Sequence, residues 1–358
     1  MQLKDRTWKS FKITDLFEIT GTKTTPLCTL KTKNETTREY PYITTKSDFM
    51  GVDGFFKFYT EEGNVIVIDS ATDGHIHYQE NNFSASDHVE KLIPKFKMNK
   101  NIGFFIVSSL KYALHEKFHY GYKLAQKRIQ RQTLMLPVDG DGNPDYEFMD
   151  RYIKNTYTLC EIDFTKKVQE KLDKITYVEI ENLDDKEWSE FFVHDVFEKV
   201  QRGKRLTEAN FIEGDMPYIS STSRNNGIRE YIGNSDKVRI FENCLTLANS
   251  GSVGSTFYHP YSFVASDHVT HLKNETFDKY TYLFLAPLIK RLKEKYNFNR
   301  EISDTRLKRE FIVLPVNENG EPDYEYMRQY MINQEINLLE KYLNYVKNQN
   351  FSDYISNK

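Results

Sequence analysis

Two identical tripeptides, Ser86-Asp87-His88 and Ser266-Asp267-His268, contain the residue types of a hydrolytic triad. In such a triad a histidine takes the serine proton while the carboxylate orients the imidazole. We place each tripeptide at the start of a strand, where adjacent side chains point to opposite faces and three consecutive residues do not converge. The sequence therefore predicts a structural role in which these polar groups bond to loop backbone.

Positive charge is concentrated in a few segments, although the chain has a formal net charge of -3. Residues 111–131 contain six cations and one acid, and residues 199–205 contain four cations and no acid. Such cations usually form solvated surface, but lysine and arginine also bind phosphates, and polar loop residues read base edges. Because the basic segments recur in both halves of the chain, we expect them to contact DNA. Aromatic residues interleave them and are expected to be core residues: Phe118, Tyr120, Tyr122, Tyr296 and Phe298.

Two further patterns resemble metal sites. His75 and His77 would share one strand face, as metal-binding histidines can. No carboxylate or cysteine cluster is evident near them, so we expect a DNA-facing or solvated pair. Residues 139–143, Asp-Gly-Asp-Gly-Asn, resemble the start of a calcium loop but lack the spacing to a final bidentate glutamate. A polar turn that leads into a helix is predicted there, and no metal site.

Two motifs resemble cofactor sites. Asn143-Pro144-Asp145-Tyr146 is close to the Asn-Pro-Pro-Tyr signature of adenine methyltransferases, but no glycine-rich cofactor loop follows a strand elsewhere. Gly251-Ser252-Val253-Gly254 lacks the Gly-Lys-Ser/Thr of a phosphate-binding loop. We therefore interpret the first motif as a helix start and the second as a turn, and predict no cofactor in this chain.

An internal repeat organises the chain, with an offset of 176 to 180 residues between equivalent positions. Pro41-Tyr42-Ile43-Thr44-Thr45 reappears as Pro217-Tyr218-Ile219-Ser220-Ser221, and Ala85-Ser86-Asp87-His88-Val89 reappears as Ala265-Ser266-Asp267-His268-Val269. Trp8, Phe11, Asp15 and Phe17 likewise match Trp188, Phe191, Asp195 and Phe197. The conserved order of these matches indicates two copies of one domain.

Each half predicts a mixed α/β (α+β) domain followed by a long helix. Short strand-like runs such as residues 65–68 and 262–265 are separated by Gly and Asn, and helical runs are expected over residues 101–117 and 279–295. Asp145 and Asp323 are candidate helix N-caps. We expect these parts: a first domain at 1–144, a spacer helix at 145–180, a second domain at 181–322, a second spacer helix at 323–350 and a tail at 351–358.

The two long helices are expected to pair as an antiparallel coiled coil that relates the domains by a pseudo-two-fold axis. Both carry apolar stripes, which must be buried: Met149, Ile153, Leu159, Val168, Leu172 and Ile175 in the first, and Met327, Met331, Leu338, Tyr342, Tyr345 and Val346 in the second. A helix of this size is ~40 Å long, similar to the ~34–36 Å that separates modules on one face of B-DNA. The helices would thus act as a ruler.

The remaining composition narrows the setting. No apolar run reaches the ~18 residues of a membrane helix, and the first ten residues are polar and charged. Cys28, Cys160 and Cys244 fit neither a disulfide framework nor a zinc pattern. We therefore expect a cytoplasmic protein that does not contact a membrane.

This plan resembles the DNA-specificity (S) subunits of type I restriction-modification systems and the related type IIB and IIG subunits. The resemblance rests on the repeated motifs above, on Arg128-x-x-Arg131 and Arg306-x-x-Arg309 before Leu-Pro-Val, and on Gln201-Arg202-Gly203-Lys204-Arg205. It implies two target-recognition domains. Leu-Pro-Val is followed by Asp-Gly-Asp-Gly-Asn-Pro-Asp rather than the Pro-Pro-x-x-Glu-Gln common in type I members, which favours the type II relatives.

The copies differ where loops would meet DNA. Gly21-Thr22-Lys23-Thr24 stands where the second copy has Arg202-Gly203-Lys204-Arg205, and Ala71-Thr72-Asp73-Gly74 where it has Gly251-Ser252-Val253-Gly254. The target would therefore be asymmetric and bipartite. The candidate DNA-contacting residues are Thr22, Lys23, Thr24, Thr44, Thr45, Lys46, Lys123, Lys127, Arg128, Arg202, Lys204, Arg205, Ser221, Ser223, Arg224, Asn225, Asn249, Ser250, Arg300, Arg306 and Lys308.

The resemblance also implies partners and cofactors. A bacterial or archaeal chain of this kind would bind double-stranded DNA and direct adenine methyltransferase subunits, with a nuclease subunit for restriction. It would have no catalytic residues of its own. S-adenosylmethionine, Mg²⁺ and ATP would belong to the partners, which would flip the target adenine. The exposed side of the helices and the terminal Phe351 and Tyr354 would dock them.

Two other classes remain open. A nuclease would need its own carboxylate cluster, but the scattered acids show no paired-motif spacing. A scaffold protein with duplicated interaction domains would show no salt-dependent DNA binding, whereas a protein that contacts phosphates loses affinity steeply with salt.

Overall fold

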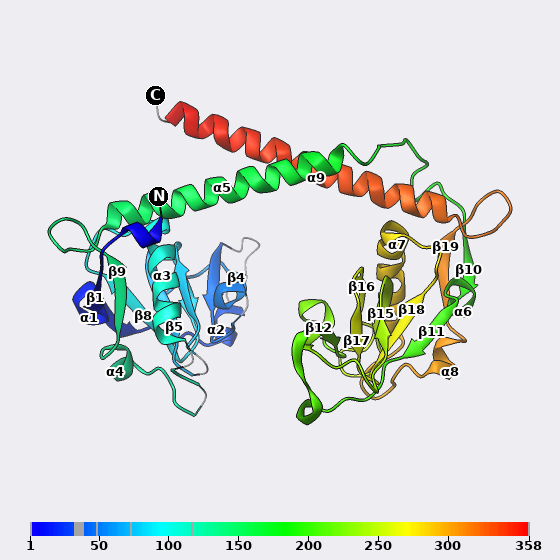
Figure 1. Ribbon diagram of the computed structural model, residues 1–358, viewed down its shortest axis with the longest axis horizontal. Coiled ribbons are helices and arrows are strands. Elements are labelled where there is room, and N and C mark those ends of the chain that lie inside the picture. Colours follow the sequence, from blue (N-terminus) through cyan, green and yellow to red (C-terminus); the bar gives the residue numbers. More distant parts are fainter. Residues whose placement is uncertain are drawn as a thin grey trace. The chain divides into compact units, whose positions relative to one another are not determined.

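The computed structural model describes residues 2–31, 39–47, 49–71, 74–115, 117–119 and 121–356. It consists of two compact units, Met1–Phe164 and Thr165–Lys358, here called unit 1 and unit 2 (Figure 1). Among the residues discussed above, Thr72, Asp73 and Tyr120 lie outside the described residues, as do the side chains of Phe351 and Tyr354.

Unit 1 is a mixed α+β domain that ends in the long helix α5. Its elements are η1 (Leu3–Asp5), β1 (Trp8–Lys12), α1 (Ile13–Leu16), β2 (Phe17–Gly21), α2 (Leu27–Lys31), β3 (Tyr40–Ile43), η2 (Phe49–Gly51), β4 (Val52–Phe56), β5 (Val65–Asp69), β6 (Ile76–Gln79), β7 (Ser84–Ala85), β8 (Val89–Pro94), α3 (Lys100–Leu114), α4 (Gln126–Ile129), β9 (Thr133–Pro137) and α5 (Tyr146–Leu172).

Unit 2 repeats the strand order of unit 1 with one additional short strand, β14, adds the 3₁₀ helix η5 after α7, and ends in α9. Its elements are β10 (Trp188–Phe192), α6 (Val193–Val196), β11 (Lys199–Arg202), η3 (Glu208–Asn210), β12 (Glu213–Ile219), η4 (Asn225–Gly227), β13 (Ile228–Ile232), β14 (Ile240–Phe241), β15 (Cys244–Ala248), β16 (Thr256–His259), β17 (Phe263–Ala265), β18 (Val269–Lys273), α7 (Lys279–Lys290), η5 (Arg291–Glu294), α8 (Asp304–Leu307), β19 (Phe311–Pro315) and α9 (Tyr324–Ser356).

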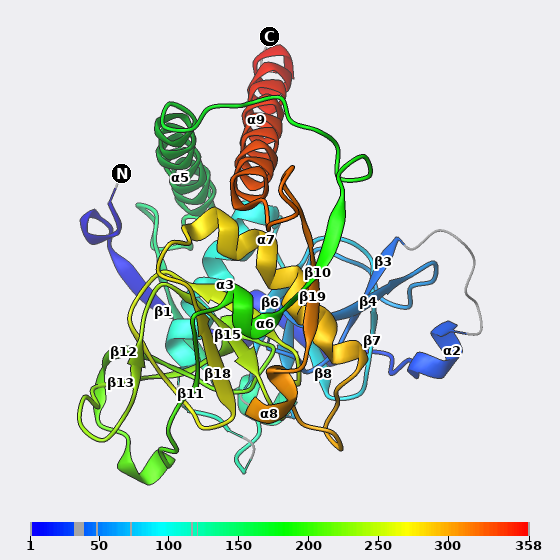
Figure 2. The ribbon, with the colours of Figure 1, turned by 90° about the vertical axis from the view of Figure 1, so that its right-hand side faces the viewer.

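The sheets of the two units have the same topology. A four-stranded antiparallel sheet has the order β2-β8-β5-β6 in unit 1 and β11-β18-β15-β16 in unit 2. A second sheet has the order β4-β3-β7 or β13-β12-β17-β14, in which β3 and β7, like β12 and β17, run parallel. Figure 2 shows α7 lying along the larger sheet of unit 2, next to the ribbon of β10 and β19. The predicted duplication is confirmed.

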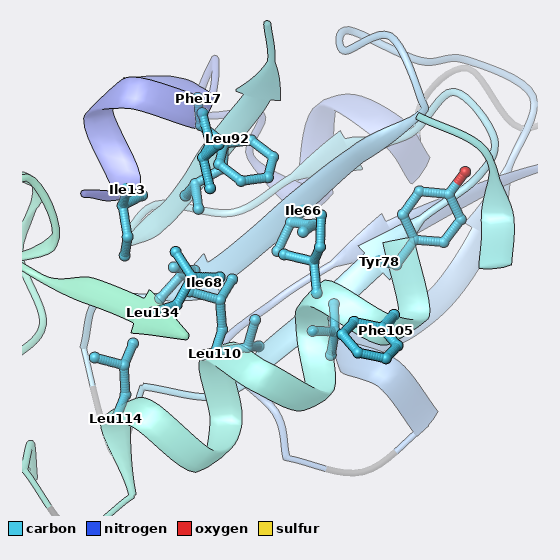
Figure 3. Packing of buried hydrophobic residues seen from close by; sticks show 14 of the residues in the cluster. Ile13, Phe17, Ile66, Ile68, Tyr78, Leu92, Phe105, Leu110, Leu114 and Leu134 are labelled. Atoms are coloured by element: carbon cyan, nitrogen blue, oxygen red, sulfur yellow. The ribbon is translucent and has the colours of Figure 1, made fainter. Parts of the chain in front are cut away.

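The core of unit 1 lies between α3 and the larger sheet. Figure 3 shows Phe105 and Leu110 of α3 facing the apolar side chains of β5, among them Ile66 and Ile68. Buried positions recur every three or four residues along α3, which is the spacing of one helix face. The helix begins where the Asn99 side chain accepts a hydrogen bond from the backbone of Ile102 at 3.0 Å.

The predicted helix starts of α5 and α9 are confirmed by their capping bonds. The carboxylate of Asp145 accepts the Phe148 N–H at 2.9 Å, and that of Asp323 accepts the Tyr326 N–H at 3.0 Å. The turn before α5 is also as predicted, because Asp139 Oδ1 accepts two backbone N–H groups, those of Asp141 and Asn143 at 2.9 Å each. A neutral residue, Asn317, does the same before α9, so this turn needs no cation.

The helix stripes are only partly buried within the two units. Leu159 of α5 and Leu338 of α9 are each 68% exposed, and Tyr345 is also exposed, whereas Val168 and Val346 are buried. Within unit 2, α9 contacts the last turns of α5, where Lys171 forms an ion pair with Glu335. Helix α9 continues to Ser356, past the predicted end at residue 350.

The helices predicted over residues 101–117 and 279–295 both end earlier than expected. Helix α3 ends at Leu114, and α7 ends at Lys290 and continues as the short 3₁₀ helix η5. Among the described helices, none has the length and apolar character needed to cross a membrane.

We expect Leu110→Ala to destabilise unit 1 by ~2–5 kcal/mol, because it leaves a cavity beneath α3. Urea unfolding measures this change. Leu159→Ala, which truncates an exposed side chain of α5, should change the free energy of unfolding by less than ~0.5 kcal/mol. Equal effects of the two substitutions would contradict the assigned core.

Candidate nucleic-acid interface

In unit 1, backbone hydrogen bonds gather several predicted residues at one end of the sheets. The Thr22 N–H donates to the Val89 carbonyl at 3.1 Å, and the Thr25 N–H donates to the Ala85 carbonyl at 2.8 Å. The Ser86 N–H donates to the Ile43 carbonyl at 2.9 Å. The segments after β2 and β3 and the turn before β8 therefore meet, and we call this the loop end of unit 1.

Unit 2 forms its loop end with the same bonds. The Lys204 N–H donates to the Ala265 carbonyl at 3.0 Å, and the Ser266 N–H donates to the Ile219 carbonyl at 2.9 Å. The Ser252 N–H donates to the Ser221 carbonyl at 2.9 Å, so the turn after β15 is also part of the loop end of unit 2. Figure 1 shows α8 and these loops at the end of unit 2 far from α9.

Several predicted residues hold this end together with their side chains. Asn249 is fully buried, and its amide group makes two hydrogen bonds with the Thr270 hydroxyl, at 2.8 and 3.1 Å. Ser250 is also buried, with its Oγ 2.7 Å from Nδ1 of His268. Neither side chain faces solvent, so both position the loops.

Arginines of the basic segments have similar bonds. Arg202 donates to Asp304 and to the Ile302 carbonyl, each at 2.8 Å, and thereby ties β11 to the segment that leads into α8. In unit 1, Arg128 donates to the Lys123 carbonyl and lies over the Tyr122 ring at 3.9 Å. These guanidinium groups are only partly exposed.

The other predicted residues lie at the surface to different degrees. Those classed as exposed are Lys23, Thr24, Lys46, Lys127, Lys204, Arg205, Ser223, Arg224, Asn225, Arg300, Arg306 and Lys308. Those that are half-buried are Thr22, Thr44, Thr45, Lys123, Arg128, Arg202 and Ser221. Some exposed cations have partners, since Lys46 pairs with Asp53, and Arg306 donates to the Glu301 carbonyl at 2.6 Å.

The two Ser-Asp-His runs lie in turns, which corrects their placement on strands. Residues 86–88 join β7 to β8, and His88 has a positive φ of 61°. In the second run, the Ser266 hydroxyl accepts the backbone N–H of His268 at 3.3 Å. The predicted structural role of these residues is thus supported by bonds within a turn.

The aromatic residues of the basic segments divide into two groups. Phe118 and Tyr296 are buried, as predicted, and the Tyr296 hydroxyl donates to the buried Glu310 at 2.6 Å. Tyr122 and Phe298 are exposed, so the prediction that they are core residues is wrong. Both lie in loops rather than in a sheet or a long helix, where their rings are not enclosed.

Sequence reasoning missed other residues of the loop ends. Arg239 donates to the Arg202 carbonyl at 2.7 Å and is exposed beside the basic segment. Ser70 donates to the His88 carbonyl at 3.0 Å, as part of the loop end of unit 1. Phe49 and Met50 also lie at this end, in the turn after β3. The repeat was the available signal, because Ser70 aligns with Ser250, and Phe49 and Met50 align with Asn225 and Asn226.

His77 lies in β6, and His75 lies just before this strand. The structure places neither of them in a metal site among the described residues. Among the described residues, no group of three or more His, Cys, Asp or Glu side chains could hold a metal ion. Burial, followed by the charge of Lys111, lowers the pKa of His77 to about 4. Its Nε2 has no hydrogen-bond partner within the part of the chain that the structure describes. His77 is therefore a half-buried ring that is neutral at pH 7.

We predict that His77 makes unit 1 less stable in acid. Its folded pKa of about 4 lies below the unfolded value of ~6.5, so the unfolded chain takes up the proton first as the pH falls. The contribution of the neutral His77 to the free energy of unfolding is fully present above pH ~6.5 and declines towards pH 4 by up to ~3 kcal/mol. His77→Phe, which introduces the residue that unit 2 has at Phe257, should reduce this decline in urea unfolding measured at several pH values.

Leu159→Ala, which removes no titratable group, provides the control for this experiment. It should show the same pH dependence of unfolding as the original chain. An unchanged decline in His77→Phe would contradict the assignment of a half-buried neutral imidazole.

A family model described as the type I restriction modification DNA specificity domain matches this chain twice, at residues 5–170 and 185–348. The specificity subunit S.BcgI of a type II restriction enzyme from Heyndrickxia coagulans is 32% identical over 336 residues, which are 92% of this chain and 94% of that protein. The S subunit of a type I restriction-modification system from M. genitalium aligns with 97% of this chain and 94% of its own, at 11% identity and a TM-score of 0.49.

The chain therefore belongs to the family of type I restriction-modification DNA specificity domains, and its two copies make it a specificity subunit with two target-recognition domains. The resemblance detected in the sequence is confirmed. Unit 1 and unit 2 each contain one of these domains.

Proposed function

We propose that the loop end of each unit reads one half of a bipartite, asymmetric duplex target. The observation that carries this proposal is the pair of equivalent loop ends with different exposed residues. Lys23 and Thr24 follow β2, whereas Lys204 and Arg205 follow β11, and all four are exposed. Cations there would bind phosphates, and the polar loop residues would contact base edges.

Buried bonds would give these loops a fixed shape before DNA binds. Asn249 and Thr270 bond to each other in the interior, and Arg202 braces the segment before α8. A loop that is already ordered loses less conformational entropy on binding, which favours affinity and specificity. We assign these residues positioning roles and leave base contacts to their exposed neighbours.

The partners in this proposal are adenine methyltransferase subunits, joined by a nuclease subunit for restriction. Exposed apolar side chains on α5, such as Tyr157, Leu159 and Ile162, suit a protein partner. Unit 1 also has an apolar groove of about 820 Å³ between β1, α3 and α5, which Trp8 and Tyr112 line. Binding of another protein would bury both of these apolar surfaces.

Catalysis and cofactors belong to the partners in this proposal. S-adenosylmethionine, Mg²⁺ and ATP would bind the methyltransferase and nuclease subunits, and this chain would contribute recognition alone, in the cytoplasm of a bacterial or archaeal cell. A magnesium-dependent nicking assay on the purified chain tests the alternative that it is itself a nuclease. Cleavage that survives repurification would contradict the proposal.

The decisive experiment selects from a randomised duplex library with the chain alone and with its methyltransferase. We expect an enriched bipartite motif with a fixed gap between two different half-sites. The gap would follow the length of the spacer helices, since the 27 residues of α5 extend over ~40 Å. Recovery of no motif under either condition, with folded protein, would contradict the proposal and favour a scaffold.

The double variant Lys204→Ala/Arg205→Ala should weaken DNA binding without loss of fold. Each cation that binds a phosphate contributes about one unit to the slope of log affinity against log salt. We expect the magnitude of the slope to fall by about 2, and the affinity to fall by roughly tenfold or more at low salt. Fluorescence anisotropy over a range of salt concentrations measures both quantities.

Two variants serve as comparisons. Lys341→Ala removes an exposed cation of α9 and should leave the salt slope unchanged. Arg202→Ala removes two internal hydrogen bonds and should lower the stability of unit 2 by ~1–3 kcal/mol. If Lys341→Ala and the double variant behave alike, the cations after β11 do not contact phosphates.

A further inference from the structure

The turn after β3 presents two large apolar side chains to solvent. Phe49 is 81% exposed and Met50 is 55% exposed. Both have positive φ angles, 47° and 55°. This left-handed region is unfavourable for bulky residues, because their side chains crowd the neighbouring backbone. Unit 1 therefore accepts both backbone strain and apolar exposure at the same two positions.

The equivalent turn of unit 2 has the same backbone with different side chains. Asn225 and Asn226 have φ angles of 47° and 51°, and Gly227 has a φ of 79°, as Gly51 does. Asparagine is among the residues that adopt this conformation most readily. The shape of the turn is thus common to both units, and only in unit 1 is it occupied by side chains that oppose it.

The turn is held by groups other than the two apolar side chains. The Thr44 N–H donates to the Gly51 carbonyl at 2.8 Å, and Gln79 Nε2 donates to the Met50 carbonyl at 3.2 Å. A Cβ at Gly51 would lie 3.7 Å from the ring of His77, so this ring lies close to the turn. Because these bonds involve the backbone of the turn and not the Phe49 and Met50 side chains, those side chains are not needed to form it.

The turn also stands at the loop end. It lies between β3 and β4, and the last residue of β3, Ile43, accepts the backbone N–H of Ser86 in the turn before β8. The predicted contacts Thr44, Thr45 and Lys46 lie between Ile43 and the turn. Phe49 and Met50 are therefore placed beside the residues proposed to read the half-site of unit 1.

We propose that Phe49 and Met50 form an apolar wedge that enters a base step of the half-site read by unit 1. Apolar side chains inserted between bases unstack and kink the duplex, and pyrimidine–purine steps yield most easily. In unit 2, Asn226 at the same place contacts a base edge by hydrogen bonds instead. This inference rests on the proposed function, and it makes the turn a source of the difference between the two half-sites.

The test exchanges the turns in the complex with the methyltransferase. Phe49→Asn/Met50→Asn should lose the preference for a pyrimidine–purine step in one half-site after library selection, and the other half-site should stay unchanged. The reciprocal Asn225→Phe/Asn226→Met should alter only that other half-site. With 2-aminopurine at the step, the original chain should increase the fluorescence severalfold, and Phe49→Asn/Met50→Asn should not.

Stability and a matched control separate this role from others. Because asparagine relieves the strain, Phe49→Asn/Met50→Asn should melt at the same temperature as the original chain or about 1–5 °C higher. Phe55→Asn removes another exposed ring of unit 1, on β4, and should leave the motif unchanged.

Each adverse outcome has one meaning. If the original chain selects a bipartite motif and Phe49→Asn/Met50→Asn selects the same one, the wedge is wrong and the proposed function stands. An altered motif without a change in 2-aminopurine fluorescence would overturn insertion. If Phe49→Asn/Met50→Asn selects an unchanged motif but binds the methyltransferase less well in the absence of DNA, the turn contacts the partner protein and not the DNA. If the original chain selects no motif, both proposals fail.

Discussion

The loop end of each unit depends on the backbone hydrogen bonds around one buried alanine, Ala85 in unit 1 and Ala265 in unit 2. The carbonyl of each accepts an N–H from the segment after the first sheet strand, and the next residue donates to the end of β3 or β12. Two parallel residue pairs, Tyr42 with Ser84 and Ile43 with Ala85, set that register in unit 1. A Cβ at Gly203 would lie 2.1 Å from the Ala265 carbonyl oxygen, so the approach in unit 2 requires glycine.

Because backbone atoms form this frame, the exposed side chains can differ between the units without altering it. Buried polar pairs, such as Asn249 with Thr270, satisfy groups that would otherwise be left unbonded in the interior. Exposed positions carry cations, amides or apolar side chains. Such a division of roles suits a protein whose two domains share a fold and recognise different sequences.

In the long helices α5 and α9, side chains fix the first turns. These turns are anchored by aspartate caps and by buried residues such as Met149 and Met327, whereas Leu159 and Leu338 are exposed. The sequence predicts that the apolar stripes are buried against each other, and this stays a prediction for the side chains that are exposed within each unit. Periodicity does not state whether the partner of such a stripe is the other helix or another protein, because both bury the same side chains.

The sequence alone determined the duplication, the mixed α+β class, the helix starts at Asp145 and Asp323, and the family. These depend on order along the chain and on local capping chemistry, which are present in the residues themselves. Only the tertiary structure decided which of the candidate DNA-contacting residues have side chains at the surface. Asn249 is buried, Arg202 is bonded internally, and the Ser-Asp-His runs lie in turns. Phe49 and Met50 appear as exposed residues only in the folded chain, because exposure depends on contacts between segments distant in sequence.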